Sequence, residues 1–183
     1  MNIIQLGRSI MGVLSDNPRN EPMHYGEVIG AWTYLTAAKA ALVAYEVFYN
    51  HAGDNDLRAF IEDINRNAIK PQIEEIEKLL KENGVALPPS PPERAVANRE
   101  SIPVGARFND QEIANTIASG IAATLVACSQ IMGQSIREDI GMMFGQFHMQ
   151  NAQYGLRMLR MLKEKGWLIQ PPLHVREAET VGV

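Results

Sequence analysis

The chain has 183 residues and a mass of 20.3 kDa, of which 46% are hydrophobic and 21% charged. This is enough for one well-packed core and short for two domains. Its 17 basic and 21 acidic residues give a formal net charge of -4, so the broad positive field that non-specific nucleic-acid binding requires is missing. A lone cysteine, Cys128, excludes an intrachain disulfide and a paired-cysteine zinc motif. The N-terminus has no basic region ahead of its apolar residues and carries Arg8 among them, which predicts no signal peptide and a cytoplasmic protein.

Two long periodic patterns predict the first half of the fold. Apolar residues recur at three- and four-residue spacing over residues 25–50 and again over residues 55–82, as on one face of a helix. Pro71 lies inside the second pattern. Because proline has no amide hydrogen and crowds the preceding turn, we expect a kink near residues 67–70 within one continuous helix.

A long connection follows at residues 84–108, where the helical pattern is lost. Prolines argue against regular structure there: Pro88, Pro89, Pro91, Pro92 and Pro103. Two further helix starts are then marked by a capping residue three positions before a glutamate, first at Asn109 and then, as the clearer signal, at Ser135. These starts predict helices over residues 110–132 and 136–165.

Connection lengths select the topology. The first two helices, and likewise the last two, are joined by a few residues, so each pair must be antiparallel. The link of about 25 residues between the pairs can return along the whole bundle, since an extended chain rises about 3.3 Å per residue. We therefore predict an all-α, ferritin-like four-helix bundle over residues 24–172, built from two antiparallel hairpins joined by a Pro-rich crossover. Residues 1–23 would be an N-terminal extension and residues 173–183 a C-terminal tail.

The two halves also share a helix ending. Residues 79–89 and residues 161–172 both contain Leu-Lys-Glu-x-Gly followed by Pro-Pro. This similarity, at an offset of about 82 residues, predicts a duplicated helical hairpin, and chance similarity between two helix ends is the alternative.

Charge is distributed unevenly among the four helices. No charged residue occurs between Ile113 and Ile136, and residues 25–50 contain only Glu27, Lys39 and Glu46. Polar side chains interrupt the uncharged run too often for a membrane span. The first and third helices are therefore expected to lack a full solvent face, which predicts a homodimer through these two helices. Burial within a monomer, under the N-terminal segment, is the alternative.

The sequence lacks the ligand set of a di-iron bundle. Such a site needs a Glu from two helices and a Glu-x-x-His from each of the other two. The third helix has no Glu after Glu112, and Gly145 stands three residues before His148. We predict no metal or other cofactor, with a divergent metal-binding protein as the alternative. The candidate ligands for that alternative are His148, His24, Glu27, Glu46 and Glu62. A protein-bonded histidine at His148 and a helix cap at His24 and Glu27 are the structural alternatives.

No catalytic pattern is present either. The sequence contains no phosphate-binding loop, dinucleotide fingerprint or serine-hydrolase elbow. Cys128 lies in an uncharged helix with no base nearby in sequence and fits a small buried side chain. We predict no catalytic or cofactor-binding residue and lean toward a non-enzymatic protein that works by self-association or partner binding. A third hypothesis is a small apolar ligand in a Met- and aromatic-lined interior.

The combined pattern resembles the spore coat protein F-like proteins and a related uncharacterised ferritin-like family of endospore-forming bacteria. The similarity covers residues 24–172 and is carried by four motifs. These are His24-Tyr-Gly-Glu27, Lys81-Glu-Asn-Gly84-Val-Ala-Leu-Pro-Pro89, Arg137-Glu-Asp139 and Lys165-Gly-Trp-Leu168. The resemblance implies a ferritin-like bundle, a role in sporulation or spore association, and coat or other proteins as partners. It implies no reaction.

Overall fold

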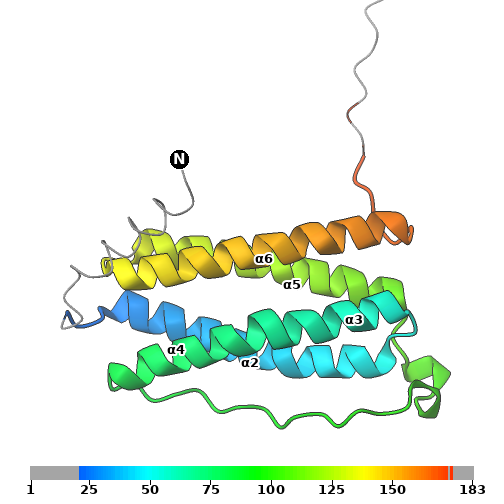
Figure 1. Cartoon of the computed structure of the whole chain (residues 1–183), viewed down its shortest axis with the longest axis horizontal. Coiled ribbons are helices and arrows are strands. Elements are labelled where there is room, and N and C mark those ends of the chain that lie inside the picture. The colour runs from blue at the N-terminus through cyan, green and yellow to red at the C-terminus, as the bar shows by residue number, and fades with distance from the viewer. Residues whose placement is uncertain (1–20, 173, 175–183) are drawn as a thin grey trace, which may run out of the picture.

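Four long helical stretches form the structure, a computed structural model that describes residues 21–172 and residue 174 (Figure 1). The helices are α2 (Tyr25–His51), α3 (Asn55–Ile64), η1 (Asn65–Ile69), α4 (Lys70–Glu82), α5 (Asp110–Gln134) and α6 (Glu138–Glu164). The segments α3, η1 and α4 follow one another without a break and make up the second stretch. The all-α prediction is confirmed, and each predicted helix boundary lies within two residues of the observed one.

The helices form two antiparallel hairpins, as the connection lengths predict. Figure 1 shows α2 packed beside α3 and α4, and α5 beside α6, with the crossover running back along the length of the bundle. Because the crossover returns to the end where α3 begins, α3–α4 and α5 run parallel (Figure 1).

Pro71 explains the irregular turn in the second helical stretch. Residues Asn65–Ile69 form a single turn of π-helix immediately before α4. The carbonyl four residues before Pro71 belongs to Asn67 and has no α-helical donor, because proline has no amide hydrogen. Gln150 of α6 supplies one, since its side-chain nitrogen lies 2.8 Å from the Asn67 oxygen. A π-bulge at residues 65–69 therefore lies within one continuous helical stretch, beside the position of the predicted kink.

The crossover is tied to α2 by side chains at heptad spacing. The Trp32 indole donates to the Ala86 carbonyl at 3.0 Å, and the buried Lys39 ammonium donates to the Pro88 carbonyl at 2.9 Å. Seven residues further along α2, the Glu46 carboxylate accepts a hydrogen bond from the Arg94 amide at 2.7 Å. A chain without regular structure thus has its backbone groups satisfied by one face of a helix.

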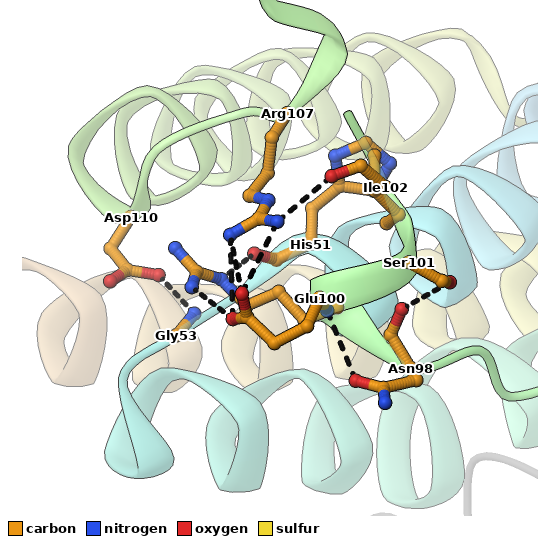
Figure 2. Close-up of polar contacts among 9 residues, drawn as sticks. His51, Gly53, Asn98, Glu100, Ser101, Ile102, Arg107 and Asp110 are labelled. Atoms are coloured by element: carbon orange, nitrogen blue, oxygen red, sulfur yellow. Dashed lines mark hydrogen bonds and ion pairs between the residues drawn. The ribbon is translucent and has the colours of Figure 1, made fainter. Parts of the chain in front are cut away.

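The end of the crossover is held against the end of α2 (Figure 2). The short helices η2 (Arg99–Ser101) and η3 (Val104–Ala106) lie there. The Arg99 guanidinium donates to the His51 carbonyl at 2.9 Å, and the His51 ring accepts from the Phe108 amide at 3.1 Å. The Gly53 amide, next to this contact in Figure 2, donates to the Asp110 carboxylate at 2.7 Å. These contacts fix where α5 begins relative to the first hairpin.

The prediction that Ser135 caps the start of the last helix is wrong. The Asn109–Glu112 capping box forms as expected at the start of α5. Ser135 instead ends α5, and its hydroxyl donates back to the Ile131 carbonyl at 2.8 Å. Among the described residues no side chain caps α6; Glu27 of α2 instead binds the amides of Ile136 and Arg137, the two residues that precede α6.

The shared helix endings adopt the same geometry. Gly84 and Gly166 have φ values of 72° and 70°. The amide after each glycine, on Val85 and Trp167, donates to the carbonyl five residues earlier at 2.9 and 2.8 Å. These are two Schellman endings, which supports the predicted duplication of the hairpin.

The core is divided into two apolar clusters. One gathers around Leu57, Ile61 and Ile117, and the other around Leu35, Ile76 and Phe144, all fully buried. Gln72 and Asn151 lie between these clusters along α4 and α6, with 3% and 4% of their surfaces exposed. The middle of the bundle is therefore polar, which positions the site described next.

Candidate functional site

An apolar groove of about 680 Å³ runs between α2 and α5. Its wall on α2 repeats at helical spacing with small side chains, at Gly26, Gly30, Thr33, Ala37, Ala41 and Ala44. The facing wall on α5 does the same, at Thr116, Gly120, Ala123, Ala127 and Gln130. Among the described residues that line it, none is charged. Such a volume and lining are typical of small-molecule sites.

Two glycines of the groove each face a side chain of the opposite helix. A Cβ atom on Gly30 would lie 3.1 Å from a side-chain carbon of Ile131, and one on Gly120 would lie 3.5 Å from the Tyr45 hydroxyl. Six of the 25 residues of α5 are buried, namely Ile113, Ala114, Ile117, Ile121, Cys128 and Ile131. Most of α5 is therefore not fully buried by the described residues. The alternative of burial under the N-terminal segment concerns residues 1–20, which lie outside the described residues.

Both groove helices are long and apolar enough to cross a membrane by length and composition. In their most apolar stretches 28% and 22% of the residues are buried. Length and composition are weak evidence for a span, because a helix at a protein interface has the same character. The apolar composition and low burial of α2 and α5 indicate instead a broad uncharged face on these two helices.

A directed chain of hydrogen bonds forms the floor of the groove. The Gln150 side-chain nitrogen donates to the Asn67 carbonyl left free by Pro71, so the Gln150 oxygen faces α4 and accepts from Gln72 at 2.8 Å. The Gln72 oxygen then accepts from the Tyr34 hydroxyl, also at 2.8 Å. The backbone carbonyl of Asn67 can only accept a hydrogen bond, so it fixes the orientation of the Gln150 amide and, through it, that of the Gln72 amide. The Gln72 oxygen then faces Tyr34, whose hydroxyl must donate to it.

Asn151 is oriented in the same way. Its side-chain nitrogen lies 2.8 Å from the Phe147 carbonyl and 3.5 Å from the Tyr34 oxygen. Since the Phe147 carbonyl can only accept, the other end of the amide is the oxygen, Oδ1. Within residues 21–172 and 174, no group donates to this oxygen, although Asn151 is 4% exposed and lines the groove.

Burial keeps the hydroxyl and thiol groups of the site neutral. Desolvation raises the pKa of Tyr34 far above its usual range and that of Tyr45 to about 12. Burial also raises the pKa of the Cys128 thiol, which donates to the Tyr34 oxygen at 3.7 Å. Cys128 is fully buried, as predicted, and acts as a packed side chain without nucleophilic character.

Two of the candidate metal ligands, His24 and Glu27, form a helix cap. The His24 ring accepts from the Gly26 amide at 2.9 Å, and the Glu27 carboxylate accepts from the His24 amide at 3.1 Å. The second carboxylate oxygen of Glu27 accepts from the amides of Ile136 and Arg137, both at 2.9 Å. The capping alternative is confirmed, and the buried Glu27 joins the starts of α2 and α6.

The remaining three candidates do not meet these two. Glu46 and Glu62 line a second cavity of about 290 Å³ with Arg66 and Lys70, and Glu62 is paired with Arg66. The His148 ring nitrogen Nδ1 lies 3.2 Å from the Leu125 carbonyl on α5, so it carries a proton there. No three His, Cys, Asp or Glu side chains in the described part of the chain are grouped as they would be around a metal ion.

Sequence reasoning missed the groove floor. Gln72 and Gln150 look like surface residues by type, and the burial of Gln72 and its bond to Gln150 follow from packing between helices that are far apart in the chain. One signal was available: Pro71 frees a carbonyl inside a helix, so a side-chain donor from another helix should be sought.

Comparison with known proteins places the chain in a family. Residues 11–179 match the model of the family described as "Protein of unknown function (DUF3231)". The chain belongs to this family. Over 167 residues it is 52% identical to the uncharacterised protein YvdQ of Bacillus subtilis (strain 168), a match that covers 91% of this chain and 98% of the relative.

Two solved structures share the fold. A crystal structure described as "a putative spore coat protein" from Bacillus halodurans C-125 is 52% identical with a TM-score of 0.85, and the match covers 87% of this chain and 100% of that one. A conserved hypothetical protein from Mycobacterium tuberculosis is 12% identical with a TM-score of 0.61, over 75% of this chain and 97% of that one. The second likeness shows the fold alone.

Proposed function

We propose that this protein is a non-enzymatic helical bundle that acts by self-association through the outward faces of α2 and α5, in assembly linked to the spore or its coat. One observation carries the proposal: α5 has no charged residue from Ile113 to its end at Gln134, and many of these positions are exposed. A face of this kind loses little hydration energy when it is covered, because no charge has to be desolvated.

The three charged residues of α2 leave the adjoining face uncharged as well. Glu27 binds backbone amides, Lys39 is paired with Glu77 at 2.8 Å, and Glu46 binds the crossover. All three are turned toward other parts of the same chain. Exposed apolar side chains remain on both helices, including Ile29, which is 64% exposed, and Val126, which is 68% exposed.

A second copy of the chain is the occupant that fits this face. An uncharged surface offers no complementarity to a charged partner, whereas two identical uncharged surfaces match each other about a two-fold axis. Val126 lies near the middle of α5, where two such helices would cross, and small neighbours such as Ala122 and Ala123 allow a close approach.

The link to the spore is supported by one relative. The Bacillus halodurans protein, described as "a putative spore coat protein", matches along its entire length at 52% identity. Coat proteins act by association, so a bundle with an exposed uncharged face suits such a role. The alternative of a metal-binding protein has no comparable support, because its candidate ligands occupy separate structural contacts.

Sedimentation of the full chain tests the proposal. We expect a dimer at micromolar concentration, and we expect Val126→Glu to yield a monomer that keeps its helical content. Val104→Glu is the matched control, because Val104 is 83% exposed and lies in η3, outside the two helices α2 and α5. A wild-type protein that sediments as a monomer, or a Val126→Glu variant that stays dimeric, would contradict the proposed interface.

A further inference from the structure

The groove between α2 and α5 contains an acceptor that the described part of the chain leaves without a donor. We propose that this groove is a binding site for an elongated, uncharged, largely apolar molecule that carries a hydroxyl or similar hydrogen-bond donor, received by Asn151 Oδ1. The site is built within one protomer and does not rest on self-association.

The buried amide is the observation that points to a ligand. Asn151 lines an otherwise apolar groove, and its side-chain oxygen is free to accept a hydrogen bond from a bound molecule. The nitrogen of the same amide is committed to the Phe147 carbonyl, so the side chain cannot turn its oxygen toward that group. Asn151 Oδ1 therefore remains an acceptor at the floor of an otherwise apolar groove.

The neighbouring groups cannot supply the missing donor. The Tyr34 hydroxyl hydrogen is committed to Gln72, and the Gln72 nitrogen donates to Gln150. That direction is set at its far end by the carbonyl freed by Pro71. The Cys128 thiol is directed at the Tyr34 oxygen. The network thus holds its own donors in place and presents one open acceptor.

The lining defines the chemical class of the ligand. Among the described lining residues none carries a charge, so an anionic or cationic group would be desolvated without a partner. Small side chains and glycines form both walls, and the stripe from Gly26 to Phe48 on α2 extends about 33 Å at 1.5 Å per residue. An elongated neutral molecule fits this shape. A plain hydrocarbon should bind less well, because it has no group that can donate a hydrogen bond to Asn151 Oδ1.

Displacement of the neutral dye Nile red by two matched probes tests the site. In the wild-type protein 1-decanol should bind about tenfold more tightly than decyl methyl ether, because only the alcohol can donate to Asn151 Oδ1. In Asn151→Leu, a variant of similar volume, this difference should disappear while the ether still binds. The Phe147 carbonyl keeps its backbone partner within α6, so the variant is expected to fold.

A second pair of variants distinguishes a block of the groove from a general effect of a bulky substitution on α5. Ala123→Phe places a ring in the groove from an exposed position and should abolish binding of both probes. Ala122 is the neighbouring residue on α5 and lies outside the groove lining, but within the proposed contact between copies. Ala122→Phe is therefore compared in the Val126→Glu chain, where it should leave the binding of both probes unchanged. Unchanged binding in Ala123→Phe, or a tenfold preference that survives in Asn151→Leu, would overturn the assignment.

The same assay distinguishes this inference from the proposed self-association. The Val126→Glu chain should still bind 1-decanol if the site lies within one protomer. Loss of binding in that variant, with a wild-type protein that does bind, would overturn a site within a single chain. Failure of the wild type to bind either probe would overturn the ligand site and leave the dimer proposal untouched.

Discussion

The Glu27 carboxylate accepts a hydrogen bond from the backbone amide of Arg137 at 2.9 Å, across 110 positions of sequence. The same oxygen accepts from Ile136, and the other oxygen accepts from His24. One side chain with 1% of its surface exposed therefore binds the starts of both α2 and α6.

Replacement of Glu27 by Gln should destabilise the protein. One of the two acceptor oxygens would become an NH₂ group facing backbone N–H donors, which leaves buried donors unsatisfied. We expect a loss of about 2 kcal/mol or more in the free energy of unfolding measured with urea. Glu75→Gln, at an exposed position of α4, is the control and should stay within about 0.5 kcal/mol of wild type. An equally small change in Glu27→Gln would show that the cap does not support the fold.

Gln150→Ala should be partly rescued by Pro71→Ala. The first change removes the donor to Asn67 and the acceptor for Gln72, and should cost about 1–2 kcal/mol. Alanine at position 71 restores a backbone N–H that can donate to Asn67 from within the helix. We therefore expect the double variant to lose less free energy of unfolding than the sum of the losses in the two single variants. Strict additivity in urea unfolding, compared with the exposed Gln146→Ala as a control, would contradict this link.

The Lys39–Glu77 pair predicts a pH dependence. The hydrogen bond from Lys39 lowers the pKa of Glu77 below its usual value. A carboxyl whose pKa is lower when folded contributes stability that is complete above its unfolded pKa of about 4.3, and that is lost as the pH falls through the folded value. Lys39→Met should lower the stability at pH 7 by about 1–2 kcal/mol, and this difference from wild type should shrink at acidic pH.

Glu77→Gln provides the matching arm of a double-mutant cycle. If the ion pair at 2.8 Å stabilises the fold, the two substitutions together should cost less than the sum of their separate effects. A Lys39→Met deficit that is constant from pH 7 down to pH 3 would show that its cause is lost packing or the lost contact with Pro88, rather than the charge of Glu77.

Gly84→Ala and Gly166→Ala should have similar effects. Both glycines are in the left-handed region, at φ 72° and 70°, and an added Cβ would meet no atom within 4 Å at either position. The cost is therefore backbone strain alone, about 1 kcal/mol for each, measured by thermal unfolding. Gly105→Ala, also in open space and without a positive φ, should be close to neutral. Clearly unequal costs at the two helix ends would contradict their structural equivalence.

Local sequence patterns were enough for the number, order and boundaries of the helices, because 3.6-residue periodicity and the Gly and Pro positions act within a few residues of chain. The crossover length then fixed the topology, since short links permit only antiparallel neighbours. The same reasoning misplaced the start of α6: Ser135 matched a local cap, but the amides there are bound by Glu27, a residue more than a hundred positions away.

The sequence by itself therefore determined an all-helical bundle of two hairpins, with an α5 that is uncharged from Ile113 onward. The tertiary structure alone decided what each polar residue does. Glu27 and Glu46 accept hydrogen bonds from backbone amides, and Lys39 donates to the crossover. Gln72 and Asn151 line the floor of the groove, and Gln150 binds Gln72 behind it. The physical reason is that a hydrogen bond depends on distance and direction in space. Only packing brings α2, α4, α5 and α6 to the positions where these side chains meet.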